Sequence, residues 1–208
     1  MQPEQDRGWP GALERGLAYS VMRGEERSGD RAVFEAWDGG ALVAAIDGLG
    51  HGADAAVAAD EAAKVLRDHP REAPEALLAR CHEALVRTRG VVMTLAWFDL
   101  EAVMLTWTGV GNVEGRLLRA HAAPGVAPES ALIKGGVIGY SLPSVRPTTT
   151  PLASGDTLVL ATDGVSSGFT SSLAHGIPAQ ALAERILADH GRGTDDALVV
   201  VVRAHVDS

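Results

Sequence analysis

The chain has 208 residues and a formal net charge of −9, with 46% hydrophobic and 22% charged residues. This length and composition are typical of a globular domain that buries a core. The acidic balance argues against a nucleic-acid partner, because a phosphate backbone is bound by a basic surface. The single cysteine, Cys81, excludes an internal disulfide and a zinc site built from several thiolates.

The amino-terminal ten residues are polar and lack the apolar stretch of a secretory signal. The densest apolar run, residues 91–98, is too short to cross a bilayer. We therefore expect a cytoplasmic protein with no membrane partner. No internal repeat or low-complexity tract is visible, so we expect a single domain over residues 1–208, with residues 1–14 as a loose tail.

The first half of the chain predicts three strands followed by two helices. The strand-forming runs are residues 16–22, 32–37 and 41–46. Asp38-Gly39-Gly40 separates the last two runs and is a hairpin signal, since Asp-Gly tolerates positive φ. Apolar residues at helical spacing predict a helix over residues 54–68 and a second helix that begins near Pro74.

The second half predicts mostly strands, with one late helix at residues 178–190. The predicted strands are residues 91–99, 103–108, 114–119, 157–162 and 197–204. Residues 120–151 are rich in Pro, Gly and Ser, which predicts loops with one short strand near residues 144–149. Strands that follow one another in hairpin-like runs favour packed antiparallel sheets with helices outside, rather than alternating β-α-β units.

Four acidic positions lie at predicted strand ends, next to glycine or a second acid. They are Asp30 in Ser28-Gly29-Asp30, Asp47 in Ile46-Asp47-Gly48, Asp163 in Thr162-Asp163-Gly164 and Asp195 in Thr194-Asp195-Asp196. Carboxylates at strand ends project into the cleft above a sheet, and Mg²⁺ and Mn²⁺ prefer such oxygen ligands together with several waters. A single Asp-Gly pair after a strand is most often only a turn. The residue types alone leave both interpretations open, and the repetition of the pattern favours a metal site.

The motifs around these acids resemble those of the PPM (type 2C) metal-dependent serine/threonine phosphatases. Residues 45–52, Ala-Ile-Asp-Gly-Leu-Gly-His-Gly, precede an alanine-rich helix and resemble the second motif of that family. Residues 158–165 resemble its later Asp-Gly motif, and residues 194–199 resemble its closing acidic strand. Ser28-Gly29-Asp30 is similar to the early acidic motif of the SpoIIE-like bacterial branch. The order and spacing of the four motifs agree over essentially the whole chain.

A narrower resemblance is to the RsbX-like stand-alone phosphatases of the stressosome. It depends on Arg80-Cys81 with Ala84, Arg89-Gly90, Val110-Gly111-Asn112-Val113, Gly139-Tyr140 and the lack of a sensor domain. Two features depart from the family pattern. The closing motif lacks the Thr that relatives usually carry soon after the acids, and residues 134–147 fit loosely, which leaves substrate contacts open.

The resemblance implies a centre of two Mn²⁺ or Mg²⁺ ions, with or without a third. The implied metal ligands are Asp30, Asp47, Gly48, Asp163, Asp195 and Asp196. Asp47 would bridge both ions and the Gly48 carbonyl would join one, while Asp163 and Asp195 would complete the shell of the other. Asp30 would act near the first ion and Asp196 near an additional, weaker one. A water shared by two cations would then attack phosphorus in line, so Asp30, Asp47, Asp163 and Asp195 are the expected catalytic residues.

We therefore expect an α+β fold, a four-layer αββα sandwich with two antiparallel sheets flanked by helices, that hydrolyses phosphoserine or phosphothreonine. The resemblance implies a phosphorylated STAS-domain partner, either a stressosome scaffold or an anti-anti-sigma factor. One alternative is a SpoIIE/RsbU-like phosphatase of a different anti-anti-sigma factor. Another is a catalytically silent binding module of the same fold, against which the complete set of aspartates argues.

Several residues invite other interpretations. Cys81 and Arg87 match the Cys-x₅-Arg spacing of tyrosine phosphatases, but they lie in a predicted helix without glycine, so we interpret Cys81 as a buried structural residue. His51 either donates a proton to the leaving group or is an exposed residue near the site, and we favour the latter. Asn112 either tolerates a left-handed backbone at a strand turn or helps shape the cleft, and we favour the turn role.

Overall fold

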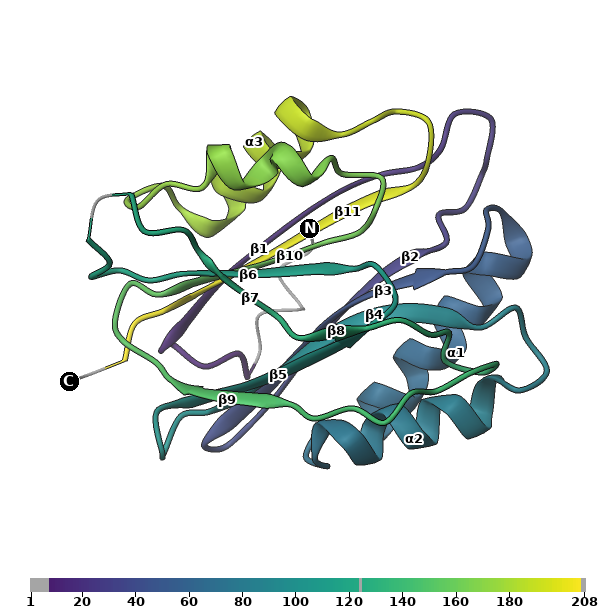
Figure 1. Ribbon diagram of the computed structural model, residues 1–208, viewed down its shortest axis with the longest axis horizontal. Coiled ribbons are helices and arrows are strands. Elements are labelled where there is room, and N and C mark those ends of the chain that lie inside the picture. The colour runs from purple at the N-terminus through teal and green to yellow at the C-terminus, as the bar shows by residue number, and fades with distance from the viewer. Residues whose placement is uncertain (1–7, 124, 207–208) are drawn as a thin grey trace.

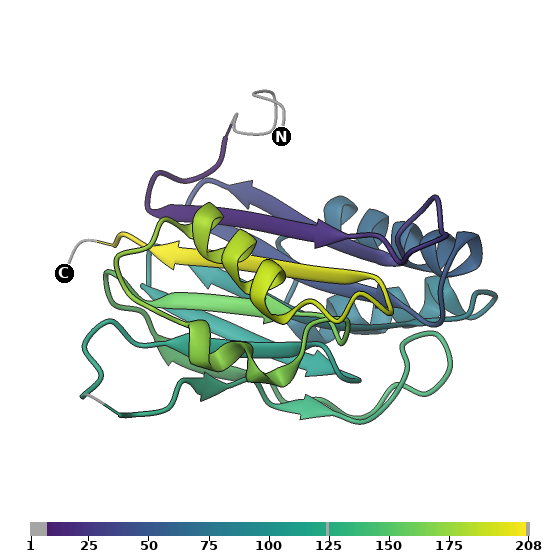
Figure 2. The same cartoon turned by 90° about the horizontal axis from the view of Figure 1, so that it is seen from above.

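The computed structural model describes residues 8–123 and 125–206, which form two sheets packed face to face (Figures 1 and 2). The first sheet has the order β1 (Leu13–Ser20), β11 (Ala197–Ala204), β10 (Thr157–Ala161), β6 (Glu114–Leu118) and β7 (Glu129–Ser130). All of its named strand pairs are antiparallel.

The second sheet is also mostly antiparallel. Its order is β2 (Asp30–Trp37), β3 (Gly40–Gly48), β4 (Val91–Asp99), β5 (Met104–Val110) and β8 (Ile133–Lys134), and β9 (Thr148–Pro151) pairs with β5 as well. The β5–β8 pair is parallel, and the other named pairs run antiparallel. Two long, hairpin-linked strands, β2 and β3, therefore carry the first two acidic motifs on one sheet.

Helices cover the outer face of each sheet (Figure 1). Helices α1 (Ala53–Asp68) and α2 (Pro74–Leu85) pack on the second sheet, and α3 (Ala179–His190) packs with the 3₁₀ helix η1 (Ser167–Ser172) on the first. The layers follow the order helix, sheet, sheet, helix, which confirms the predicted αββα sandwich. Of the helices in the described ranges, none has the length and apolar character needed to cross a membrane.

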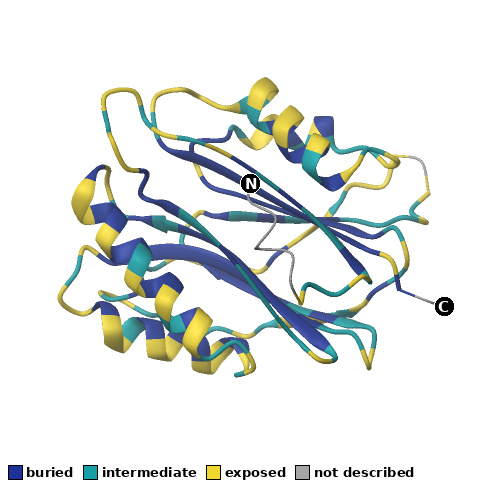
Figure 3. Ribbon diagram, turned by 180° about the vertical axis from the view of Figure 1, so that it is seen from behind, coloured by how far each residue is buried: buried dark blue, intermediate teal, exposed yellow. Residues whose placement is uncertain are grey.

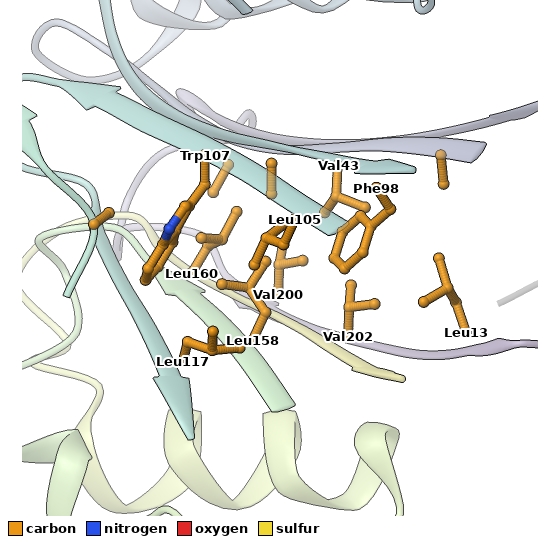
Figure 4. Packing of buried hydrophobic residues seen from close by; sticks show 14 of the residues in the cluster. Leu13, Val43, Phe98, Leu105, Trp107, Leu117, Leu158, Leu160, Val200 and Val202 are labelled. Carbon is orange, nitrogen blue, oxygen red and sulfur yellow. The ribbon is translucent and has the colours of Figure 1, made fainter. Parts of the chain in front are cut away.

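Three apolar layers hold the sandwich together. The central layer lies between the sheets and contains Val43, Phe98, Trp107, Leu160 and Val200 (Figure 4). The other two layers lie between each sheet and its helices, so the sheets are buried on both faces while the outer sides of the helices are exposed (Figure 3). Full burial of an aliphatic or aromatic side chain contributes about 1.5–3 kcal/mol, so these layers supply most of the stabilisation.

Strand β3 illustrates why the strands are continuous apolar runs in the sequence. Its residues alternate between the central layer, which receives Val43, and the layer under α1 and α2, which receives Leu42 and Ile46. Since successive side chains of a strand point to opposite faces, a strand buried on both faces needs apolar residues throughout. Alanines on the buried face of α1, including Ala59 and Ala62, are small enough to let this helix lie close to the sheet.

The predicted elements agree with most of the observed ones. The strands predicted at residues 91–99 and 197–204 coincide with β4 and β11, and the helix predictions begin within one residue of α1 and α3. Strands β7 and β8 and helix η1 were not predicted, because such short polar segments carry no periodicity. The short strand expected near residues 144–149 occurs later, as β9.

The predicted loose tail was too long. Strand β1 begins at Leu13, which is 2% exposed, rather than at residue 16. Trp9 also packs against the central layer, where its ring lies edge-on to Phe34 with a centroid distance of 5.6 Å. The apolar pattern did not predict this strand start, because the charged Glu14 and Arg15 interrupt it. Residues 1–7 of the predicted tail lie outside the described residues.

Candidate active site

The acidic strand ends converge on one pocket of about 380 Å³ at one end of the sandwich. Asp47 reaches it from the end of β3 on the second sheet. Asp163 and Asp195 reach it from the first sheet, where β10 ends and β11 begins. Since β10 and β11 are antiparallel neighbours, the end of one strand lies beside the start of the other. The structure thus brings together three predicted residues that are far apart in the sequence.

Asp30 lies next to this pocket but is not part of its lining. The β2–β3 register places Asp30 opposite Asp47, and only 6% of Asp30 is exposed. Its Oδ2 accepts a 2.7 Å hydrogen bond from the hydroxyl of Thr162, and that hydroxyl also accepts a 2.8 Å bond from the amide of Leu198. Thr162 therefore connects the two sheets beneath the pocket, a role that the sequence pattern did not indicate.

Burial and mutual repulsion perturb the two paired carboxyl groups. Burial, together with the negative charges of the neighbouring aspartates, Asp30 foremost, raises the pKa of Asp47 to about 8. Burial also raises the pKa of Asp30 to about 7, against the lowering effect of the Thr162 hydrogen bond. Both groups therefore tend to keep their protons in the absence of metal, and a bound cation would favour the ionised forms of both groups.

Asp196 fastens a loop. Its Oδ1 accepts a hydrogen bond from the Met22 amide at 2.8 Å, and its Oδ2 accepts one from the Gly29 amide at 2.7 Å. The residue is 4% exposed. Both oxygens are thus engaged at the two ends of the β1–β2 connection. This geometry gives Asp196 a structural role, and its role as a metal ligand stays a prediction.

Asn112 acts through its side chain. Its Nδ2 donates a 2.8 Å hydrogen bond to Oδ2 of Asp163. The left-handed backbone position in this turn belongs to Gly111, with φ of 100°, and not to Asn112. Asn112 lies in the turn, but the preferred interpretation, a left-handed backbone at Asn112, was wrong: the glycine adopts the unusual backbone conformation, and the amide beside it contacts a pocket carboxylate.

The two Asp-Gly pairs need glycine for close packing. A Cβ at Gly48 would lie 2.2 Å from the carbonyl oxygen of Ala55, and a Cβ at Gly164 would lie 1.9 Å from that of Asp196. Neither glycine has a positive φ. Close backbone approach, rather than turn geometry, therefore explains why glycine follows Asp47 and Asp163.

His51 also lines the pocket, and its partner is Glu25 in the β1–β2 connection. His51 Nδ1 lies 2.6 Å from Glu25 Oε1. Sequence reasoning missed Glu25, because nothing in its local motif distinguishes it from an exposed acid. Cys81, in contrast, is fully buried in α2, and burial raises the pKa of its thiol to about 12, as expected for a structural cysteine.

The oxygen donors fit a hard divalent ion. Over residues 8–123 and 125–206, no three or more His, Cys, Asp or Glu side chains stand close enough together to hold one metal ion. Asp47, Asp163 and Asp195 therefore face one pocket without forming a closed cage. Mg²⁺ is usually held by one or two carboxylates and keeps several waters, so such an open arrangement suits it.

Comparison with known proteins places this geometry in context. The sequence profile of the family described as stage II sporulation protein E (SpoIIE) matches residues 38–205. No curated protein sequence matches the chain. A solved protein described under “The bacterial stressosome: a modular system that has been adapted to control secondary messenger signaling” is 27% identical, with a TM-score of 0.84, and the match covers 92% of this chain and 99% of that one.

Two further solved structures share the fold. RsbX in complex with magnesium is 20% identical with a TM-score of 0.83, and the match covers 94% of this chain and 96% of RsbX. The PP2C phosphatase domain of SpoIIE from Bacillus subtilis, solved with a fragment of its regulatory domain, is 24% identical with a TM-score of 0.73. That match covers 92% of this chain and 63% of the SpoIIE chain. The sandwich fold of this chain is thus shared with RsbX and with the phosphatase domain of SpoIIE.

Proposed function

Because this chain belongs to the SpoIIE family of PPM-type serine/threonine phosphatases, we propose that it hydrolyses phosphoserine or phosphothreonine on a protein with two Mn²⁺ or Mg²⁺ ions. The observation that carries this proposal is the convergence of Asp47, Asp163 and Asp195 on one pocket. Bound divalent ions would supply a water of lowered pKa and would offset the charge of the phosphoryl oxygens.

The residues of the chain divide into those that would hold the ions and those that fix the holders. Asp47, the Gly48 carbonyl, Asp163 and Asp195 would hold the ions, with Asp30 beside them. Asn112 restrains one oxygen of Asp163, which leaves the other oxygen for a cation. Thr162 does the same for Asp30. Partners of this kind orient ligating carboxylates and tune their affinity for metal.

The proposed substrate is a phosphorylated STAS-domain protein, either a stressosome scaffold or an anti-anti-sigma factor. Membership of the SpoIIE family supports this choice. The 27% identity to a protein solved in the context of the bacterial stressosome supports the scaffold in particular. A SpoIIE/RsbU-like role on a different anti-anti-sigma factor is the alternative.

The test begins with p-nitrophenyl phosphate in Mn²⁺, in Mg²⁺ and in excess EDTA. We expect metal-dependent release of nitrophenolate that EDTA abolishes. Asp47→Asn and Asp163→Asn should abolish turnover while the far-UV circular dichroism spectrum stays that of the wild type. Release without metal, or normal activity in either variant, would contradict the proposal, and no release with any divalent metal would favour a silent binding module.

The substrate is tested separately with phosphorylated STAS-domain proteins. A scaffold and an anti-anti-sigma factor, each phosphorylated by its kinase, are incubated with the metal-loaded protein, and the remaining phosphate is measured by mass spectrometry. Faster dephosphorylation of the scaffold supports the stressosome assignment. Faster dephosphorylation of the anti-anti-sigma factor supports that substrate in place of the scaffold.

A further inference from the structure

A carboxylate–imidazole pair stands at the acidic pocket. His51 lines the pocket, and its Nδ1 lies 2.6 Å from Oε1 of Glu25. From this arrangement we propose that His51 is the general acid that protonates the serine or threonine oxygen as it leaves phosphorus, and that Glu25 is its positioning residue. The proposal rests on the phosphatase function proposed above.

Elimination among the pocket residues points to the same side chain. Among the described residues, the ionisable side chains that line the pocket are those of Asp47, His51, Asp163 and Asp195. The three aspartates are the proposed holders of the metal ions, and ligating carboxylates must be deprotonated. This leaves the imidazole of His51 as the proton donor available to a bound phosphate ester.

The chain holds Glu25 against His51 from two sides. The connection that carries Glu25 is fastened by Asp196 at Met22 and at Gly29, and the Glu25 amide donates a 3.0 Å hydrogen bond to the Met22 carbonyl. On the other side, a Cβ at Gly52 would lie 2.8 Å from Glu25 Oε2, so the glycine leaves room for the carboxylate.

This pairing determines how the ring presents its nitrogens. An ionised carboxylate only accepts hydrogen bonds, so Nδ1 of His51 carries the proton that it shares with Glu25. Nε2 is then the nitrogen that exchanges a proton with a bound group. Other charges beside the turn that carries His51 are those of Arg89, whose Nη1 would lie 2.8 Å from a Cβ at Gly50, and of Asp54, which pairs with Arg89 at 3.0 Å.

The proton has a defined place in the reaction. The oxygen of water forms the new bond to phosphorus, and the bond between phosphorus and the serine oxygen breaks, with its electron pair going to that oxygen. The proton on Nε2 of His51 passes to the serine oxygen, and the proton lost by the attacking water returns to the imidazole through solvent. A serine alkoxide is a strong base and leaves poorly without this proton, whereas nitrophenolate is a weak base and leaves without it.

The experiment uses this difference between leaving groups. Mn²⁺-loaded wild type and His51→Gln are compared on a phosphoserine peptide, on phenyl phosphate and on p-nitrophenyl phosphate. We expect His51→Gln to lose roughly 10²-fold or more in kcat on the phosphoserine peptide, with KM little changed, and to lose least on p-nitrophenyl phosphate. Glu25→Gln should show the same ranking of substrates with smaller losses.

A matched control is available in the pair of His69 Nδ1 and Glu72 Oε1, which are 3.4 Å apart outside the pocket lining. His69→Gln should leave all three rates unchanged. Equal losses of His51→Gln on the three substrates, or no loss on any, would overturn the general-acid role. A far-UV circular dichroism spectrum like that of the wild type separates equal losses from misfolding, and absence of metal-dependent activity in the wild type itself would overturn the phosphatase proposal instead.

Discussion

The side-chain amide of Asn112 donates a 2.8 Å hydrogen bond to Oδ2 of Asp163, across the gap between the β5–β6 turn and the end of β10. The bond restrains a carboxylate that lines the pocket. Removing it with Asn112→Ala frees Asp163 to rotate, so the Mn²⁺ concentration for half-maximal activity should rise about 10-fold or more. Titration of p-nitrophenyl phosphate hydrolysis with Mn²⁺ measures this shift.

The control for Asn112 removes a comparable exposed hydrogen bond elsewhere. The hydroxyls of Thr106 and Thr149 lie 2.9 Å apart between β5 and β9, away from the pocket lining. Thr149→Ala should leave the Mn²⁺ dependence unchanged. An unchanged Mn²⁺ dependence in Asn112→Ala as well would show that the contact with Asp163 has no functional role.

The paired carboxyl groups of Asp30 and Asp47 make the metal-free protein less stable as pH rises. The folded chain keeps these protons up to about pH 7 and about pH 8, while an unfolded aspartate loses its proton near pH 3.8. Unfolding therefore releases protons over this range, and the free energy of unfolding falls as pH increases. Each group contributes up to about 1.4 kcal/mol for every unit of its pKa shift.

Asp47→Asn isolates this effect, because the amide does not ionise. In EDTA, the stability of the variant relative to the wild type should increase between pH 5 and pH 8, as measured by urea unfolding at each pH. In the wild type, Mn²⁺ should raise the melting temperature more at pH 8 than at pH 6, because metal binding displaces the protons. A stability difference that stays constant with pH would contradict the raised pKa of Asp47.

Substitutions of Asp196 test whether this residue tethers the β1–β2 connection or binds a metal ion. Asp196→Ala removes the acceptor of two amides, the part-buried one of Met22 and the buried one of Gly29, and should destabilise the protein by roughly 3 kcal/mol. Hydrogen exchange at both amides should accelerate, and Asp196→Asn, which keeps one acceptor oxygen, should give a smaller effect. If Asp196→Asn instead lowers Mn²⁺ affinity and leaves the exchange of both amides unchanged, Asp196 is a ligand rather than a tether.

The sequence predicts the parts of this protein whose signals are local. Strand β4 is recognisable because burial of both faces requires a continuous apolar run. Asp47 and Asp163 are recognisable because each follows such a run and precedes a glycine. The supporting contacts have no local signal: Thr162 is 132 residues from Asp30, Asn112 is 51 residues from Asp163, and Glu25 is 26 residues from His51. Such side chains gain their roles only when the two sheets meet.

The glycines after Asp47 and Asp163 give the last prediction. A Cβ at Gly48 would come within 2.2 Å of the Ala55 carbonyl oxygen, and one at Gly164 within 1.9 Å of the Asp196 carbonyl oxygen. Both obstacles are backbone atoms, which cannot move aside as a flexible side chain does, so Gly48→Ala and Gly164→Ala should each destabilise the protein by about 2–4 kcal/mol.

Gly11→Ala is the matched control for both variants, because a Cβ there meets nothing within 4 Å and its φ is not positive. Urea unfolding should show a change of no more than about 1 kcal/mol for this variant. Displacement of the backbone at Gly48 also moves Asp47, so activity should fall further than the loss of folded protein explains. If Gly48→Ala and Gly164→Ala are as stable as Gly11→Ala, these glycines serve the turns alone, and the close backbone packing beneath the pocket does not position its carboxylates.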